Sequence, residues 1–252
     1  MRRHWLLAFS GIFIVAARAP ILVPDVSQRK VDIVYSFTGA ELLLFGAIIY
    51  PDGRLPNSQT DIAVVLKGPS QKIQVWEKQR LFGTIWANVA SSRFQSSPGY
   101  YAIATSRPLT KMVDNTTAAI YELGLNNIQL SPSDANEPDK LRRFEGGLVG
   151  LKRKNALFLD RTNTVEITDG VLYRARLALP ARVPIGHYTA ETFLVQNGKV
   201  IAAATRDIEI RKSGFERFVA RAAESSPFLY GLAAIMLSLA LGWMASALSK
   251  RF

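Results

Sequence analysis

The longest apolar stretch of the chain lies near its C-terminus, at residues 228–248, which include two serines and no charged side chain. A helix of this length covers about 30 Å, which is the thickness of the hydrocarbon core of a bilayer. Tyr230 and Trp243 lie near the two ends of the stretch, where aromatic side chains favour the headgroup region. We therefore predict a transmembrane helix at 226–248.

Both flanks of this stretch are polar. Lys250 and Arg251 follow it as a cationic stop, so residues 249–252 are expected to form a cytoplasmic tail. Residues 213–225, which precede it, place apolar side chains at helical spacing with charged side chains between them. The apolar set is Phe215, Phe218, Val219 and Ala222, and the charged set is Glu216, Arg217, Arg221 and Glu224. We predict an amphipathic juxtamembrane helix near the membrane surface.

Residues 1–19 have the pattern of a secretory signal peptide. Arg2 and Arg3 precede an apolar run at 6–17, and an A-x-A cleavage site ends at Ala19. Pro20 directly after that site disfavours cleavage there, so an uncleaved N-terminal anchor is the alternative. Because the basic residues at both ends of the chain stay inside, we expect the body between them to be exported.

Between these ends, short runs of alternating or apolar residues predict β-strands. Turn signals such as Pro51-Asp52-Gly53 separate the runs, which favours packed sheets over a parallel βαβ arrangement. The expected strands are at 31–37, 42–50, 61–67, 72–78, 84–89 and 100–105, and later at 165–167, 172–179, 189–195 and 200–210. They give an N-terminal β-rich part at 20–107 and a C-terminal β part at 156–212.

The late strands indicate an immunoglobulin-like sandwich. Pro184-x-Gly186-x-Tyr188 leads into one strand, and Asn197-Gly198 is a type I′ hairpin signal before the next. This combination recurs in immunoglobulin-like domains. The predicted fold is therefore mainly β, an immunoglobulin-like β-sandwich with a short helical insertion and one C-terminal transmembrane helix.

The helical insertion is expected at 108–155, where the hydrophobic period changes. A first helix is predicted at 110–123, ending before Gly124. A second is predicted after Asn136 and Pro138. Its apolar face comprises Leu141, Phe144, Leu148 and Leu151.

The net charge of the chain indicates which class of partner it attracts. There are 31 Lys and Arg against 20 Asp and Glu, a net charge of +11, and without the three arginines of the signal segment it is 28 against 20, or +8. Scattered charges of this kind favour attraction to lipid headgroups over nucleic-acid binding. The basic run at 152–154, with Arg142 and Arg143, is either an anion or headgroup site or a solvated helix face, and we favour the solvated face. The absence of cysteine excludes disulfides, thiolate metal sites and cysteine nucleophiles.

A series of short, different sequence blocks lies in order along nearly the whole chain. They are Phe37-Thr38-Gly39-Ala40, Leu44-Phe45-Gly46-Ala47, Lys67-Gly68-Pro69, Gly83-Thr84-Ile85-Trp86-Ala87-Asn88, Pro98-Gly99-Tyr100-Tyr101-Ala102 and Ser106-Arg107-Pro108-Leu109, then Pro184-x-Gly186-x-Tyr188, Lys212-x-Gly214-Phe215-Glu216, Leu229-Tyr230-Gly231 and Gly242-Trp243. These blocks resemble the alphaproteobacterial putative transmembrane protein family.

The resemblance implies a bacterial inner-membrane protein with a signal sequence, a periplasmic domain and one C-terminal helix. Members of the family tend to be encoded beside a permease of the sulfite/sulfonate exporter type, which implies an accessory role beside that integral membrane protein. The family has no established catalytic residues, so none is carried over to this chain.

Sequence motifs for catalysis or cofactor binding are not evident. The two histidines, His4 and His187, lie in the signal segment and at a strand start, so neither a paired-histidine metal site nor a Ser/His/Asp triad is visible. No Walker or GxGxxG pattern follows a strand. We therefore expect a protein that is not an enzyme and takes no cofactor or metal. We interpret Asp160, Glu166 and Asp169 as charges that protect strand edges.

Trp86 and Asn88 fall on one face of a predicted strand. They are either a core tryptophan beside an amide that pins a loop, or part of a binding patch, and we favour the core.

Two classes of function follow. The first is an accessory or scaffolding subunit whose membrane helix packs beside another integral membrane protein through a stripe of small residues: Gly231, Ala234, Ser238, Gly242 and Ala245. The alternative is a membrane-anchored periplasmic domain that binds or senses a small anion. The patch predicted for that alternative comprises Trp86, Asn88, Arg107, Arg142 and Arg143.

Overall fold

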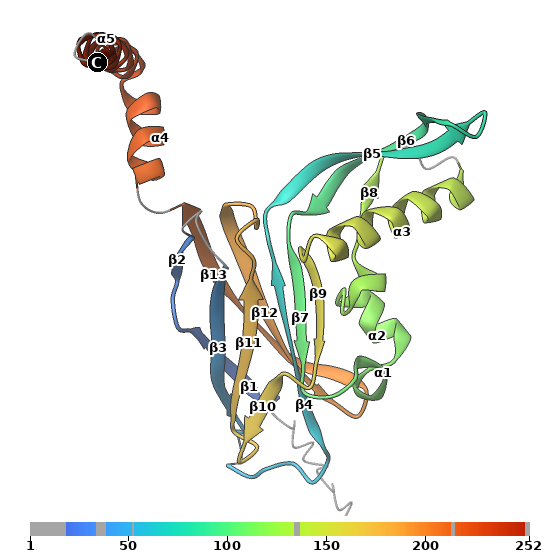
Figure 1. Ribbon diagram of the computed structural model, residues 1–252. Helices are drawn as coiled ribbons and strands as arrows, with labels where there is room; N and C mark the ends of the chain where they lie inside the picture. Colours follow the sequence, from blue (N-terminus) through green and yellow to red (C-terminus); the bar gives the residue numbers. More distant parts are fainter. Residues whose placement is uncertain (1–18, 34–38, 52, 134–136, 213–214, 250–252) are drawn as a thin grey trace, which may run out of the picture.

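Two β-sheets pack face to face and form the body of the protein (Figure 1). The computed structural model describes residues 19–33, 39–51, 53–133, 137–212 and 215–249. The first sheet has the strand order β1-β3-β11-β10, and the second has the order β2-β13-β12-β4-β7-β9. Their bounds are β1 (Ile21–Val26), β2 (Lys30–Ile33), β3 (Ala40–Ile49), β4 (Thr60–Lys67), β7 (Tyr101–Thr105), β9 (Phe158–Thr162), β10 (Val165–Thr168), β11 (Leu172–Leu179), β12 (Gly186–Gln196) and β13 (Lys199–Lys212).

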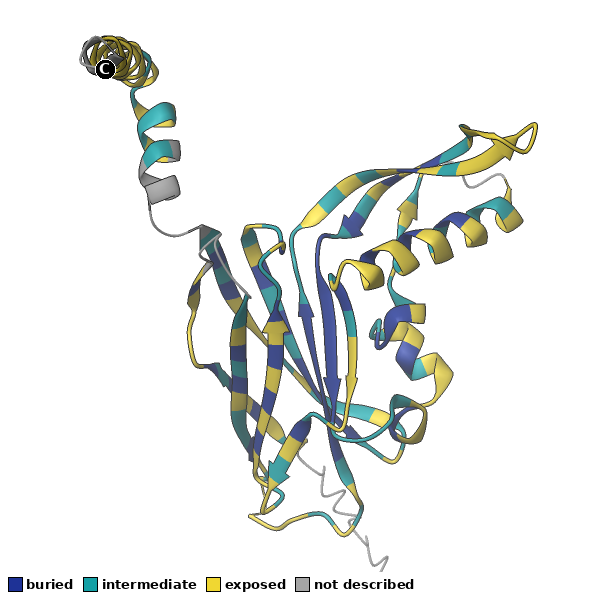
Figure 2. Cartoon of the chain, viewed as in Figure 1, coloured by how far each residue is buried: buried dark blue, intermediate teal, exposed yellow. Residues whose placement is uncertain are grey.

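The main core lies between the two sheets. The strand predicted at 172–179 is confirmed as β11, which alternates exposed and buried residues along its whole length (Figure 2). Its inward side chains meet those of the second sheet. The largest contributors are Leu42, Leu44 and Ile48 on one side and Ile62, Leu66, Tyr100 and Tyr188 on the other.

A second core covers the outer face of the second sheet. It packs helices α1 (Leu109–Met112) and α2 (Asn115–Ile120) and the short helix η1 (Leu125–Asn127) against β4, β7 and β12. On β4, Ile62 and Val64 therefore face the first core, while Ala63 and Val65 face the second. Burial on both faces explains why the sequence of β4 is a nearly continuous apolar run instead of an alternating one.

The helix predicted at 110–123 is broken into α1 and α2. Val113 adopts an extended conformation, and Asp114 accepts a hydrogen bond from the backbone N–H of Thr117 at 2.6 Å. Asp114 thus acts as the N-cap of α2 and begins a new helix where the periodicity predicted continuity.

A third sheet stands outside the sandwich. β5 (Ser70–Leu81) and β6 (Ile85–Pro98) form a long antiparallel hairpin, to which β8 (Ser131–Pro132) adds a short edge. The strands predicted at 72–78 and 84–89 exist, but their placement within the sandwich is wrong. Helix α3 (Pro138–Lys154) packs on this hairpin, with Phe144 and Leu148 against Val75 and Phe94 (Figure 1).

The second predicted helix is confirmed as α3, with Pro138 in its first turn, while Asn136 lies outside the described residues. Its predicted apolar face is wrong at one end, because Leu151 is 52% exposed and Lys152 is 9% exposed. The lysine takes the inward position, so the solvated face favoured for the basic run at 152–154 does not hold for Lys152.

Three strands, β1, β8 and β9, lie outside the predicted strand ranges, and β1 is the one that completes the first sheet. β1 pairs with β3 at the edge of the first sheet, and Pro24 lies within it opposite Gly46. Proline cannot donate a ladder hydrogen bond, and an edge strand tolerates it because one side of that strand needs no partner. Leu22 and Val26 of β1 are buried in the main core.

The prediction of a mainly β fold with a C-terminal apolar helix is confirmed. The immunoglobulin-like assignment stays a prediction, although two of its local features are present. Tyr188 donates a hydrogen bond from its hydroxyl to the carbonyl oxygen of Pro184, as in the tyrosine corner of such domains. Asn197 and Gly198 have φ of 50° and 80° and join β12 to β13 in a tight hairpin.

Two helices follow the sandwich, α4 (Phe215–Ser225) and α5 (Pro227–Ser249). In Figure 1 α5 is seen along its axis and α4 from the side, so the two helices lie at a steep angle to each other. The predicted signal segment lies, except for Ala19, outside the described residues. So do residues 34–37 of the first predicted strand, residues 213 and 214, and residues 250–252 of the predicted tail.

Candidate interaction surfaces

The most exposed apolar element of the described chain is α5. Residues Pro227–Ser246 are long and apolar enough to cross a membrane, and none of that span is buried against the rest of the described chain. Residues 227–246 are exposed except Gly231, which is half-buried (Figure 2). Such a surface is stable only in lipid or against another apolar partner.

The predicted small-residue stripe lies on this helix. Residues three and four apart share a helical face, so Gly231, Ala234, Ser238, Gly242 and Ala245 form one line. The hydroxyl of Ser238 donates a hydrogen bond to the carbonyl oxygen of Ala234 at 2.9 Å. Because this bond satisfies the hydroxyl within the helix, the stripe presents a nearly flat surface without an unpaired donor, as close helix packing in lipid requires.

The arginines of the predicted anion patch are not brought together. Arg107 follows β7 and pairs with Asp61 of β4, whereas Arg142 and Arg143 lie on α3. Arg142 pairs with Asp139 on its own helix at 2.5 Å, and Arg143 pairs with Glu77 of the hairpin at 3.2 Å. Each of the three arginines is thus matched to a different carboxylate.

Trp86 and Asn88 lie on β6 far from the sandwich core. Trp86 is 60% exposed, and the guanidinium carbon of Arg80 lies 4.9 Å from the centre of its ring. The core position that we favoured for Trp86 is therefore wrong. The error has a physical cause, because β5 and β6 pair with each other beyond the edge of the sandwich, where no other described element covers the outer part of their faces.

Exposed apolar side chains gather around Trp86 at the end of this hairpin. We call residues 78–88 the hairpin tip; every one of them is exposed except Ala87, which is half-buried (Figure 2). Its large apolar side chains are Leu81, Phe82, Ile85 and Trp86, and Phe82 is 96% exposed.

Lys152 is the buried charge of α3. Its ammonium donates a hydrogen bond to the carbonyl oxygen of Gly99 at 3.3 Å and lies 5.8 Å from the centre of the Phe158 ring. Burial lowers the pKa of Lys152, because removal from water disfavours the charged form. These contacts tie α3 to the start of β7 and point the ammonium away from solvent.

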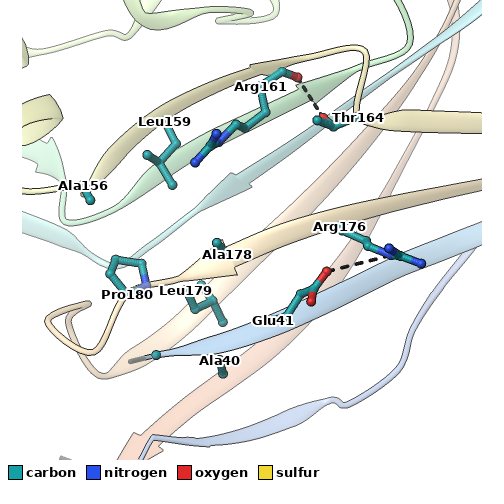
Figure 3. Close-up of a pocket in the computed structure, with 11 residues that line it drawn as sticks. Ala40, Glu41, Ala156, Leu159, Arg161, Thr164, Arg176, Ala178, Leu179 and Pro180 are labelled. Atoms are coloured by element: carbon teal, nitrogen blue, oxygen red, sulfur yellow. Dashed lines mark hydrogen bonds and ion pairs between the residues drawn. The ribbon is translucent and has the colours of Figure 1, made fainter. Parts of the chain in front are cut away.

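An open groove of about 540 Å³ lies between the edge of the second sheet and the first sheet (Figure 3). Leu159 and Leu179 line it, together with Glu41, Arg161 and Arg176. Arg176 lies 3.8 Å from Glu41, and both side chains are largely exposed. No ion pair within the described part of the chain involves Arg161, whose guanidinium lies beside Leu159 in Figure 3.

The sequence carried no signal for this groove. Arg161 and Arg176 belong to different sheets, and their proximity depends on how β9 and β11 face each other across the open side of the sandwich. Among the described residues, no group of three or more His, Cys, Asp or Glu side chains is placed to hold a metal ion.

Comparison with known proteins gives a family. A family model described as "Putative transmembrane protein (Alph_Pro_TM)" matches residues 21–251. No curated protein and no solved structure matches the chain. The match runs from the first strand of the sandwich through the whole of α5, so it covers both the β domain and the apolar helix. This chain therefore belongs to the Alph_Pro_TM family of transmembrane proteins.

Proposed function

We propose that this protein is a non-enzymatic accessory subunit of another integral membrane protein. In this proposal α5 anchors the chain in the bacterial inner membrane, the sandwich lies in the periplasm, and the C-terminus is cytoplasmic. The family match to a transmembrane protein and the one candidate span found among the described residues support the anchoring. The basic residues at both ends of the chain support the orientation.

The observation that carries the proposal is the uncovered surface of α5. The rest of the described chain buries none of its apolar span, and one face of the helix consists of small residues. In lipid, helices associate through close packing of small residues, because apolar burial alone gives no preference for protein over lipid. The small face is therefore where a partner helix would pack.

The partner we propose is a permease of the sulfite/sulfonate exporter type. The support for this choice is the gene neighbourhood that family resemblance implies. An accessory role needs no catalytic centre in the chain itself, only an anchor and an exposed domain that reach the partner together.

Two variants of α5 test this function. Ser238→Leu with Gly242→Leu places bulky side chains on the small face, and Ala240→Leu places a leucine on the opposite face, at roughly 180° around the helix. Full-length protein is purified from its native membrane in mild detergent, and the proteins that accompany it are identified by mass spectrometry. We expect the double variant to lose a permease that the wild type and Ala240→Leu retain. Equal recovery with all three proteins would refute the helix-packing proposal.

A second candidate function is the binding of a small anion in the groove of Figure 3. The observation that favours it is Arg161, a guanidinium beside the groove without an ion-pair partner among the described residues. Titration of the full-length protein in detergent with sulfite, a sulfonate and phosphate tests it. We expect heat that Arg161→Gln abolishes and Arg54→Gln, at an exposed loop position, leaves intact. An absence of heat with all three anions would exclude this function.

A further inference from the structure

The hairpin tip exposes large apolar side chains that the folding of the sandwich does not require. Its four large apolar side chains are between 42% and 96% exposed, while the hairpin nearer the sandwich is covered by α3. The turn itself directs one of them outward, because Phe82 has a φ of 50° and Gly83 a φ of 76°. A bulky residue rarely adopts a positive φ, so the exposed aromatic at the turn is held there by the hairpin geometry and not by core packing.

The charge of the tip is of one sign. Residues 78–88 include Lys78 and Arg80 and no acidic residue. Over the whole hairpin, residues 70–98, four basic residues stand against the single acid Glu77, which already pairs with Arg143. Apolar and aromatic side chains flanked by cations are the composition of protein segments that lie in the interface of an anionic bilayer.

The hairpin and the membrane anchor leave the sandwich at the same end. Thr189 of β12 pairs with Lys67 at the end of β4 and with Asp207 of β13. The hairpin therefore leaves the sandwich at the end where β13 stops and the chain continues into α4 and α5 (Figure 1).

The length of the hairpin gives it reach. The 12 residues of β5 extend about 40 Å at roughly 3.3 Å per residue, and only Gly68 and Pro69 separate this strand from the end of β4. The exposed residues lie at the far end of this arm. An arm that leaves from the anchored end of the domain can contact the same membrane that the anchor crosses.

We propose that the hairpin tip is a second membrane-binding element. It inserts Leu81, Phe82, Ile85 and Trp86 at the boundary between headgroups and acyl chains, while Lys78 and Arg80 contact anionic headgroups. A lipid surface fits the tip better than a protein does, because a stable protein interface requires roughly 20 to 30 residues on each side and the tip offers about half as many. This inference depends on membrane anchoring and not on the identity of a partner.

The absence of cysteine allows a direct test. Thr84→Cys lies in the exposed turn of the tip, and the control Gln59→Cys lies in an exposed loop at the opposite end of the sandwich, beside the start of β4. Each full-length variant carries the environment-sensitive fluorophore NBD on its cysteine. It is reconstituted without other proteins in nanodiscs of phosphatidylethanolamine and phosphatidylglycerol, with and without lipids that carry a doxyl quencher.

We expect the label at position 84 to show a blue-shifted emission and quenching by the doxyl lipids, and the label at 59 to show neither. Adding Phe82→Ser and Trp86→Ser to Thr84→Cys should abolish the quenching while thermal unfolding stays unchanged. A label at position 84 that remains in water would overturn the proposal. Quenching that survives the two serine substitutions would also overturn it. A blue-shifted emission at position 84 that is seen only in native membranes, and not in the nanodiscs, would indicate a protein contact and would overturn it as well.

Discussion

Arg107 and Asp61 form an ion pair that joins the chain after β7 to β4, with Nε of the arginine 2.7 Å from Oδ1 of the aspartate. Asp61 is 3% exposed and also accepts a hydrogen bond from the hydroxyl of Ser106 at 2.9 Å. A buried carboxylate requires such partners, because its transfer from water is costly without them. The arginine that the sequence placed in a binding patch therefore has a structural role.

Substitution of Arg107 tests this role. We expect Arg107→Ala to lower the free energy of unfolding by about 2 kcal/mol, below the range for fully buried pairs because the arginine is itself one-third exposed. Asp61→Asn with Arg107→Ala should cost less than the sum of the two single changes. Chemical denaturation of the four proteins measures the coupling, and strict additivity would show that the two side chains do not interact.

The hydroxyl of Tyr188 should stabilise the turn before β12. It donates a hydrogen bond to the carbonyl oxygen of Pro184 at 2.5 Å from a side chain with no exposed surface. Tyr188→Phe is expected to lower the free energy of unfolding by about 1 kcal/mol. Tyr121→Phe is the matched control. The hydroxyl of Tyr121 makes no hydrogen bond within the described part of the chain, and its ring packs on Phe193, a contact that phenylalanine at this position keeps. Equal effects of the two substitutions would contradict the role of the turn.

Alkaline pH should unfold the β domain. Burial raises the pKa of Tyr100, Tyr101 and Tyr188 above its usual value near 10. Their contribution to stability is complete below pH 10 and is lost at higher pH, because the unfolded chain then loses these protons while the folded chain retains them. The three groups together give a fall of up to about 4 kcal/mol per pH unit.

Absorbance of tyrosinate and circular dichroism, followed together in one pH titration, measure this loss. The buried tyrosines should ionise only as the β signal disappears. Lys152 has the opposite effect. Burial lowers the pKa of Lys152, so the cost of burying its charge disappears and the domain gains stability as pH rises toward about 10.5. This gain comes from one group, whereas the loss comes from three. Ionisation of all tyrosines at pH 10 in a folded domain would contradict the burial.

The hairpin tip should be dispensable for folding. Replacement of residues 79–87 by Asn-Gly closes the hairpin across the pair Lys78 and Asn88 with a favourable type I′ turn. We expect the free energy of unfolding to change by less than about 0.5 kcal/mol, as for other exposed sites. Phe94→Ala removes a fully buried side chain of the same hairpin and should cost about 3 kcal/mol. A comparable loss from the tip replacement would mean that the tip belongs to the folded core.

The orientation of α5 can be measured with reporter fusions. Lys250 and Arg251 should hold the C-terminus in the cytoplasm. Green fluorescent protein fused after Phe252 is expected to fluoresce, and alkaline phosphatase at the same position is expected to stay inactive. An active phosphatase would reverse the topology.

Local patterns were enough to predict the mainly β fold and the apolar helix. The alternation at 172–179 and the Asn197-Gly198 turn specify their structures through neighbouring residues alone. The pairing of β5 with β6 outside the sandwich was not predictable in this way. Both strands have ordinary strand patterns, and Trp86 is exposed because no other element of the described chain packs over the outer half of the hairpin.

The candidate sites depended even more on tertiary structure. Arg107, Arg142 and Arg143 are cations in sequence, but each has a carboxylate partner that only the fold brings near. Lys152 and Leu151 exchange their expected places, because α3 turns its last apolar residue outward and directs the ammonium of the lysine inward, toward the Phe158 ring.

The central claim, that α5 packs beside another membrane protein, is tested most directly by crosslinking in the native membrane. A photoreactive amino acid at Ser238 lies on the small face, and the same group at Ala240 lies on the opposite face. We predict that irradiation joins the position 238 variant to one larger membrane protein, identified by mass spectrometry as a permease, and leaves the position 240 variant largely unjoined. The same weak, diffuse products at both positions would contradict the claim and indicate a helix surrounded by lipid.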